Sequence, residues 1–323
     1  MDALHISEDE VGSLLGIDAC IDAVEAAFQR EDAGLASSHP RRRLYAPDGT
    51  LHAMEALDLG LGRAVVKVYT SFATAVRFAV LLFDSGSGAL LAVIEGDRLG
   101  QLRTGAATGV ATRHMARAEA SILGMIGAGW QAEAQVAAVA AVRPLREVRA
   151  YCRSAERRSA FAARVSQAVG VEVTAAGSAE EAARGADILV TATTSRAPVL
   201  TAHMLEPGVH INAIGGNAAD RLEVEPAAIG ACARVVVDSV EQARVESGEL
   251  IAAVRARKLR WEAVRELREI VTGVRPGRDR RDEITLFKSL GVALEDVAVA
   301  SLVHDRAVRA GAGRSIPLWR ARS

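Results

Sequence analysis

The chain has 323 residues, of which half are apolar and 4% aromatic, and its 39 Lys and Arg nearly balance its 40 Asp and Glu. This length allows two domains, and a net charge of −1 gives no electrostatic reason to bind nucleic acid or an anionic membrane, so we expect a small-molecule partner. The three cysteines lack metal-ligand spacing, which predicts that no metal is bound. The N-terminus lacks a signal-peptide pattern and no apolar run approaches ~18 residues, which predicts a cytoplasmic protein.

The first third of the chain predicts a helix, a group of strands and a second helix. Apolar residues at helical spacing predict one helix from Ser7 or Asp9 to about Arg30. Over residues 41–94, short runs rich in Val, Leu, Tyr and Phe alternate with Asp, Gly and Ser turns, which predicts antiparallel strands. A helix is expected over about 100–114.

After Arg117 the pattern alternates between strands and helices, as is typical of a doubly wound parallel sheet. Six strands are expected in the segments SILGMIGAG, EVRAYCRS, VEVTAA, DILVTATTS, HINAIGG and RVVVDS. Three helices are expected between them, over 132–142, 156–169 and 179–184. Ser178 and Glu181 have the spacing of a capping box for the third helix.

The remaining residues predict a charged helical segment over about 241–271 and a last helix over 286–310. The last helix would return the chain to the first domain. The expected fold is therefore α/β, with a Rossmann-type doubly wound parallel sheet (117–297) inserted into an α+β domain (1–116 plus 298–323).

A dinucleotide site is predicted where the first strand of the parallel sheet meets its helix, in the pattern G-x-G-x-x-A. The first glycine permits the tight turn, the second lets a pyrophosphate approach the backbone, and the helix N-terminus offers free N–H groups. The expected contacts are Gly127, Ala128, Gly129, Trp130 and Gln131. A glycine-rich turn without a ligand is the alternative interpretation.

The end of the second strand bears on which dinucleotide is bound. A site for NAD(H) usually has an acid ~20 residues past the glycine pattern, whereas this chain has Cys152, Arg153 and Ser154 there. A guanidinium and a hydroxyl suit a 2′-phosphate, so Arg153 and Ser154 favour NADP(H), with NAD(H) as the alternative. Arg153 is otherwise interpreted as a solvated residue at a strand end.

Segments along nearly the whole chain resemble the ornithine cyclodeaminase/μ-crystallin family. They are HPRRRLYAPDGTLHAM, VVKVYTSF, DSGSGALLAVIEGDRLGQLRTGAATG, ILGMIGAGWQAEAQ, ADILVTATTS, LEPGVHINAIGGN and EITLFKSLGVALED. The family includes cyclodeaminases of ornithine and lysine, amino-acid dehydrogenases, and ketimine or cyclic imine reductases. The resemblance implies hydride exchange with a nicotinamide and a homodimer formed through the first, substrate-binding domain.

The resemblance also places three substrate-binding cations at Arg41, Lys67 and Arg103. Guanidinium groups suit a substrate α-carboxylate, and an ammonium in an apolar strand is costly unless it meets an anion or has a lowered pKa. Lys67 is therefore a candidate for carboxylate binding and for proton transfer at an imine nitrogen. Without the resemblance, each charge has a simpler interpretation. Arg41 would belong to a solvated run of three arginines, Lys67 to a polar face of its strand, and Arg103 to the first turn of a helix.

One departure from the family bears on the reaction. Cyclodeaminases and some dehydrogenases of the family have an aspartate after the fifth strand of the parallel sheet, whereas this chain has Gly215, Gly216 and Asn217. An amide does not accept a proton as a carboxylate does, which disfavours deamination, while a protonated iminium needs only a hydrogen bond between its nitrogen and Asn217. Asp220 and Glu223 are either substitutes for the missing carboxylate or solvated acids.

Three further residues are candidate cofactor contacts, namely Thr104, Thr193 and Lys288. The whole sequence predicts an NAD(P)-dependent oxidoreductase that reduces a ketimine or cyclic imino acid, or runs the reverse amino-acid dehydrogenation. The alternatives are an amino-acid cyclodeaminase with bound NAD+ and a non-catalytic, crystallin-like protein that binds NADP(H).

Overall fold

The fold is that of a computed structural model, which describes residues 2–72 and 76–318. Residue contacts divide the chain into two compact units, unit 1 (1–103 with 292–323) and unit 2 (104–291). Helix α3 (Asp97–Met115) runs through the first of these boundaries. The domain boundaries expected from the sequence, after residues 116 and 297, remain a prediction.

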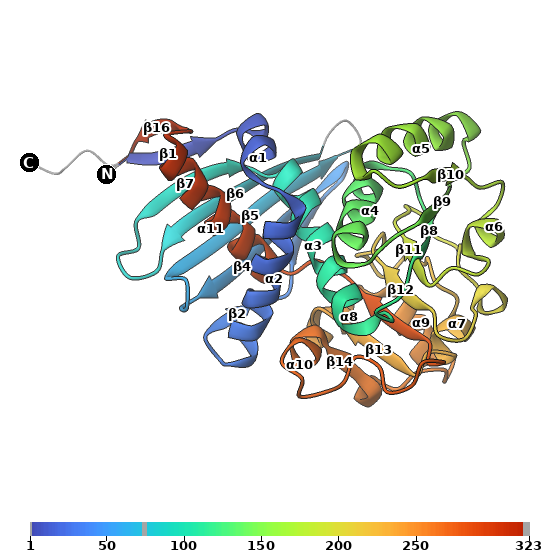
Figure 1. Cartoon of the computed structure of the whole chain (residues 1–323). Helices are drawn as coiled ribbons and strands as arrows, with labels where there is room; N and C mark the ends of the chain where they lie inside the picture. The colour runs from blue at the N-terminus through green and yellow to red at the C-terminus, as the bar shows by residue number, and fades with distance from the viewer. Residues whose placement is uncertain (1, 73–75, 319–323) are drawn as a thin grey trace, which may run out of the picture. The chain divides into compact units, whose positions relative to one another are not determined.

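An eight-stranded sheet forms the centre of unit 1 (Figure 1). Its spatial order is β16-β1-β7-β6-β5-β4-β2, with β3 paired to β4; β1 and β7 are parallel and the other neighbours antiparallel. The strands are β1 (Asp2–Ile6), β2 (Ala36–Ser38), β3 (Arg42–Ala46), β4 (Gly49–Asp58), β5 (Arg63–Phe72), β6 (Val76–Asp84), β7 (Leu90–Glu95) and β16 (Arg314–Pro317). The antiparallel strands predicted over residues 41–94 are confirmed.

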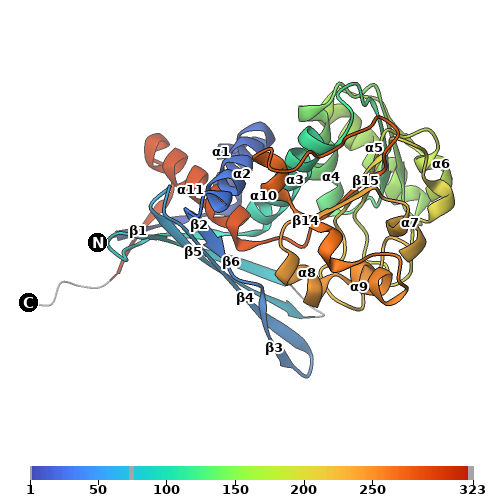
Figure 2. The same ribbon diagram turned by 90° about the horizontal axis from the view of Figure 1, so that it is seen from below.

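Three helices of unit 1, α1 (Glu8–Leu14), α2 (Ile17–Asp32) and α11 (Ala293–Ala310), lie on the same face of this sheet (Figure 2). The prediction of one helix from Ser7 or Asp9 to Arg30 was wrong in its continuity. Leu15 leaves the helical region with φ −111° and ψ 127°, and Gly16 becomes the N-cap of α2. The apolar periodicity continues across this break, so periodicity alone did not reveal it.

The strands alternate between a helix-covered face and an open face. In β5, Val65, Lys67 and Tyr69 are buried, while Val66 and Val68 between them are only partly buried. Because successive side chains in a strand point to opposite faces, Lys67 points toward the helices. The lysine therefore lies on the core face of the sheet.

Unit 2 is built on an eight-stranded parallel sheet in the order β10-β9-β8-β11-β12-β15-β13-β14. Its strands are β8 (Ile122–Ile126), β9 (Glu147–Tyr151), β10 (Val173–Ala175), β11 (Ile188–Thr191), β12 (His210–Ala213), β13 (Arg234–Val237), β14 (Val264–Glu266) and β15 (Thr285–Lys288). The chain order reverses between β8 and β11, which is the switch point where α/β sheets bind ligands. The predicted doubly wound parallel sheet is confirmed.

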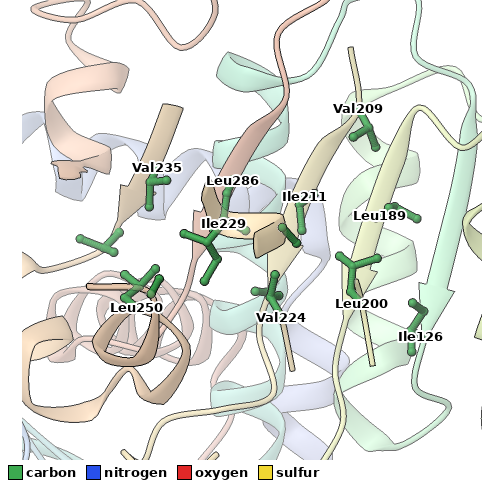
Figure 3. Packing of buried hydrophobic residues seen from close by; sticks show 14 of the residues in the cluster. Ile126, Leu189, Leu200, Val209, Ile211, Val224, Ile229, Val235, Leu250 and Leu286 are labelled. Carbon is green, nitrogen blue, oxygen red and sulfur yellow. The ribbon is translucent and has the colours of Figure 1, made fainter. Parts of the chain in front are cut away.

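Helices cover both faces of this sheet. They are α4 (Trp130–Val142), α5 (Ala155–Val169), α6 (Ala179–Ala183), α7 (Pro226–Gly230), α8 (Val240–Glu246), α9 (Gly248–Arg255) and α10 (Leu267–Val271). One core cluster joins the strands to α4 and α5, and the other, shown in Figure 3, joins Leu189, Ile211 and Leu286 to Ile229 of α7 and Leu250 of α9. Across residues 2–72 and 76–318, no helix is both long and apolar enough to span a membrane.

Two predictions for the last third of the chain were wrong. Residues 286–288 belong to β15, which lies between β12 and β13, and the last helix begins only at Ala293. The segment 241–271 is divided into α8, α9, β14 and α10. A short apolar run surrounded by other strands has no alternation, so its periodicity does not separate strand from helix.

The cap predicted at the start of α6 is half confirmed. The Ser178 hydroxyl accepts a hydrogen bond from the Glu181 N–H at 3.1 Å, as expected. The Glu181 carboxylate, however, accepts from the Gly177 N–H at 2.6 Å rather than from the Ser178 backbone. The Glu181 carboxylate therefore holds the backbone of Gly177, the residue before the N-cap.

Candidate active site

Three basic side chains predicted to bind substrate come together inside unit 1. Arg41 precedes β3, Lys67 lies in the middle of β5, and Arg103 lies in α3. Their exposed fractions are 7%, 1% and 8%. The neighbouring Arg42 is exposed and pairs with Glu55, so the run of arginines is not one solvated face. Arg41 instead donates from Nε to the Met54 sulfur at 3.4 Å, on the buried face of β4.

Two acidic residues from the first turn of α11 neutralise part of this positive charge. The Asp296 Oδ1 atom lies 3.0 Å from the Lys67 Nζ and 3.2 Å from the Arg103 Nε. The Glu295 Oε2 atom lies 2.8 Å from the Arg103 Nη1. Both carboxylates are fully buried, so each needs a cation beside it.

Sequence reasoning missed the roles of Glu295 and Asp296. The segment that contains them was used for the family resemblance, but their adjacency to the cations depends on packing over 192 and 229 residues. A usable signal was present, because these two acids stand at the start of a helix whose first turns are otherwise apolar. Charged residues are seldom fully buried unless they are paired.

The surroundings of Lys67 shift its protonation toward neutrality. Burial, followed by the nearby Arg103 charge, lowers the pKa of Lys67 to about 8, while Asp296 opposes this shift. For Arg103, burial would lower the pKa, but Asp296 and Glu295 outweigh burial and raise it. Arg103 is thus a permanent cation, whereas Lys67 can exchange a proton near neutral pH.

Aromatic rings border the ammonium of Lys67. The Lys67 Nζ lies 5.3 Å from the centroid of the Phe78 ring and 6.0 Å from that of Tyr69. His52 stacks on Tyr69 at 4.1 Å, and burial together with Arg43 and Arg41 lowers the pKa of His52 to about 4. The His52 ring is therefore uncharged at neutral pH.

The predicted phosphate-binding loop of unit 2 has the geometry that a dinucleotide requires. Gly127 has φ +123°, and a Cβ atom there would lie 2.3 Å from the Ala192 carbonyl oxygen. Gly129 is the N-cap of α4 and makes no side-chain cap, and apart from its chain neighbours no described residue has an atom within 4 Å of its Cβ position. The helix N-terminus and the open space beside Gly129 therefore fit a pyrophosphate.

The other loop residues flank this turn. Ala128 and Gln131 are partly buried, and Trp130 is 54% exposed at the first position of α4. At the end of β9, Arg153 is exposed, and the Ser154 hydroxyl caps α5 by accepting from the Arg157 N–H at 3.2 Å. Arg158 donates to the Cys152 carbonyl oxygen at 2.7 Å, which fixes the strand end.

Glu223 fastens two loops at the carboxyl ends of β11 and β12. Its Oε1 atom accepts from the Thr193 N–H at 2.6 Å and the Thr193 hydroxyl at 2.7 Å. Its Oε2 atom accepts from the Thr191 hydroxyl at 3.0 Å and the Gly215 N–H at 2.6 Å. Burial raises the pKa of Glu223, and Lys288 opposes this shift. Glu223 is fully buried, so it is not a solvated acid.

Asn217 and Asp220 lie on the same segment but at its surface. Both are exposed, and Asp220 pairs with Arg196 at 3.3 Å. Asn217 follows Gly216, whose Cβ position would lie 3.6 Å from the Lys288 Nζ and 3.5 Å from the Glu249 carboxylate. The loop that carries Asn217 therefore rests on a buried pair of opposite charges.

Lys288 and Thr104 are both buried. Lys288 lies at the end of β15 with no exposed surface, and its Nζ is 3.3 Å from the Glu249 carboxylate. Thr104 is 7% exposed within α3. Direct contacts of these two residues with a cofactor remain a proposal. Among the described residues, no group of three or more His, Cys, Asp or Glu is arranged to hold a metal ion.

The sequence model of the ornithine cyclodeaminase/μ-crystallin family matches residues 2–311. Alanine dehydrogenase of Archaeoglobus fulgidus is 35% identical, over 99% of this chain and 100% of that protein. Delta(1)-pyrroline-2-carboxylate reductase of Bacillus cereus is 38% identical, over 81% of each chain. These relatives act on amino or imino acids, as their names state.

Two solved structures have closely similar folds. One is Delta(1)-pyrroline-2-carboxylate reductase of Thermococcus litoralis with NADH and L-proline, at TM-score 0.93 and 34% identity, covering 97% of this chain and 100% of that chain. The other is an archaeal alanine dehydrogenase dimer with bound NAD, at TM-score 0.93 and 34% identity, covering 99% and 100%.

The two loop glycines provide a matched test of the phosphate-binding turn. Gly127→Ala places a methyl group against the Ala192 backbone at positive φ, so we expect a loss of stability of about 1–3 kcal/mol. Gly129→Ala contacts no other described residue beyond its chain neighbours, and it should keep the melting temperature but weaken dinucleotide binding. Thermal unfolding and a fluorescence titration measure the two effects. A Gly129→Ala variant that binds like the wild type would contradict this assignment.

Proposed function

The chain belongs to the ornithine cyclodeaminase/μ-crystallin family, and on that premise we propose that it is an NAD(P)-dependent oxidoreductase of imino acids. It reduces the C=N bond of a ketimine or cyclic imino acid in the cytoplasm, or runs the reverse amino-acid dehydrogenation. The observation that carries the proposal is the buried cluster of Arg41, Lys67 and Arg103 in unit 1. A cluster of three buried cations is suited to an anionic substrate.

Substrate binding follows from the charges of this cluster. Arg41 and Arg103 bind the α-carboxylate through their guanidinium groups, which match the two oxygens of a carboxylate. Glu295 orients the Arg103 guanidinium, because its carboxylate holds the Nη1 atom at 2.8 Å. Fixing the carboxylate also fixes the imine carbon, so positioning supplies part of the rate.

The reaction adds a hydride to the imine carbon and leaves a proton on the nitrogen. A reduced nicotinamide supplies the hydride when the dinucleotide is bound to unit 2. Lys67, with a pKa of about 8, is mostly an ammonium at neutral pH and can donate a proton to the nitrogen or stabilise the carboxylate. Asn217 hydrogen-bonds the nitrogen and orients it.

Two other functions make different predictions. A cyclodeaminase needs a carboxylate that accepts a proton from the substrate amine, and Asn217 carries an amide at the place of that carboxylate. A non-catalytic binder would take up NADP(H) and leave every imino acid unchanged. The buried cluster of cations in unit 1 favours a protein that also binds an anionic substrate over one that binds NADP(H) alone, because buried charges are costly.

We predict that the purified protein oxidises NADPH in the presence of pyrroline-2-carboxylate or piperideine-2-carboxylate. Lys67→Met should lower kcat/KM at least about a hundredfold, since it removes the proton donor and one carboxylate partner. Lys258→Met, at an exposed lysine, is the matched control and should keep activity. Absorbance at the nicotinamide band measures the rates.

The same screen includes ornithine and lysine with NAD+ and an ammonia assay. Ammonia released from ornithine without net reduction of the cofactor would establish a cyclodeaminase instead. Tight NADPH binding with no turnover of any imino acid would establish a non-catalytic binder.

We propose that the dinucleotide is NADP(H), with Arg153 and Ser154 at its 2′-phosphate. Support comes from the exposed guanidinium of Arg153 at the end of β9 and from the N-terminus of α5 that follows it. Gly127, Ala128, Gly129, Trp130 and Gln131 hold the pyrophosphate, and Thr104, Thr193 and Lys288 are supporting contacts.

Arg153→Ala should lower kcat/KM for NADPH roughly tenfold and leave that for NADH nearly unchanged, because only the phosphate of NADPH needs the guanidinium. Arg164→Ala is the matched control, since Arg164 is an exposed arginine of α5 that pairs with Glu133. Steady-state kinetics with both cofactors measure the ratio. A wild-type protein that prefers NADH would overturn the assignment.

We also propose a homodimer through the open face of the unit 1 sheet. Val66, Val68, Leu81 and Val93 alternate with the buried residues of their strands, so they lie on the face opposite α1, α2 and α11, and each is only partly buried. An apolar sheet face of this kind is typical of a protein interface. The similar alanine dehydrogenase structure is described as a dimer.

Leu81→Lys should convert the dimer to a monomer, because the ammonium would be buried in the interface without a partner. Val308→Lys is the control, since Val308 is 57% exposed on α11, on the helix side of the sheet. Sedimentation velocity measures the masses. A wild-type monomer, or a Leu81→Lys dimer of unchanged stability, would disprove this interface.

A further inference from the structure

Asp296 occupies a central place in the cationic cluster of unit 1. One oxygen of its carboxylate, Oδ1, lies within 3.0 Å of the Lys67 Nζ and 3.2 Å of the Arg103 Nε. Asp296 and Lys67 have exposed fractions of 0% and 1%. A single buried atom from α11 thus contacts a cation of β5 and a cation of α3.

We propose that Asp296 is the positioning residue that keeps Lys67 charged for catalysis, whereas Glu295 orients Arg103. This inference rests on the proposed imino-acid reduction, and it assigns separate tasks to two adjacent carboxylates. Asp296 acts through Lys67 and is not itself a proton donor to the substrate.

The charges that face Lys67 explain why it needs this partner. Arg103 approaches from α3 and Arg41 from the segment before β3, and both positive charges favour the neutral amine. The rings of Tyr69 and Phe78 lie beside the ammonium, with centroids 6.0 and 5.3 Å from the Lys67 Nζ. Asp296 is the anion that favours the ammonium, by its charge and by a hydrogen bond.

The interactions of Asp296 differ from those of a buried carboxylate that accepts hydrogen bonds from backbone N–H groups. Asp238, also buried, accepts hydrogen bonds from the N–H groups of Leu290 and Gly291 at 2.6 and 2.7 Å and so fastens a loop. Asp296 makes no such contact through Oδ2, which has no hydrogen-bond partner in the described part of the chain. Its contacts are with the two cations, so its main effect is electrostatic.

The titration of Lys67 can be measured directly because the chain has three lysines, Lys67, Lys258 and Lys288. Lysine labelled with 13C at Cε gives one NMR signal for each, and Lys67→Arg and Lys258→Arg assign them. We expect a wild-type midpoint for Lys67 near 8. A wild-type midpoint below 6 would already overturn the proposal, because Asp296 would then fail to keep the ammonium.

Asp296→Asn should move the Lys67 midpoint down by at least about one pH unit, since an amide of the same size removes the negative charge. The alkaline limb of kcat/KM should move by the same amount, so that activity at pH 8 falls several-fold while activity at pH 6 changes less. The sign follows because the ammonium is the active form and is lost as pH rises through a lower pKa.

Glu295→Gln is the matched control, because its carboxylate contacts Arg103 and not Lys67 in the salt bridges of the cluster. It should raise KM for the imino acid and leave both the NMR midpoint and the alkaline limb in place. Equal shifts in the two variants, or no shift in Asp296→Asn, would overturn the proposal. A shifted NMR midpoint in a protein that reduces no imino acid would instead refute the proposed function and keep the electrostatic role of Asp296.

Discussion

The ion pairs that α11 makes with β5 and α3 are the constraint on which the architecture of unit 1 depends. Lys67 is buried on the core face of the sheet and Arg103 is buried in α3, where unpaired charges would be strongly destabilising. Their carboxylates come from a helix near the end of the chain, 192 and 229 residues away. The chain must therefore return to its first sheet after completing unit 2, and the C-terminal helix is part of the site as well as part of the core.

Unit 2 uses buried carboxylates differently, to hold backbone loops. Glu223 joins the ends of β11 and β12 through Thr193 and Gly215, and Asp238, which follows β13, joins that strand to the residues after β15. The carboxyl ends of parallel strands are where such sheets bind ligands, and loops there have few other backbone partners. Two acids thus give fixed positions to four strand ends, including the loop that carries Asn217.

The sequence predicted most of the alternating elements, because apolar runs and turn residues are local signals. It failed at β15, where residues 285–288 are surrounded by other strands and show no alternation, and at Leu15, where helical periodicity continues across a break. The family resemblance located Arg41, Lys67 and Arg103. It did not reveal that Asp296 and Glu295 neutralise two of them, or that Glu223 is buried, because these facts arise from packing between distant segments.

The arrangement around Asn217 favours reduction over deamination on physical grounds. Deamination needs an ionised carboxylate that is free to take a proton from the substrate amine. Glu223 already receives hydrogen bonds on both oxygens from Thr191, Thr193 and Gly215, and Asp220 is exposed and paired with Arg196. Neither acid of this segment is therefore placed to replace the missing aspartate. Reduction of a protonated imine needs no such base, because the hydride adds to carbon and the nitrogen already carries its proton.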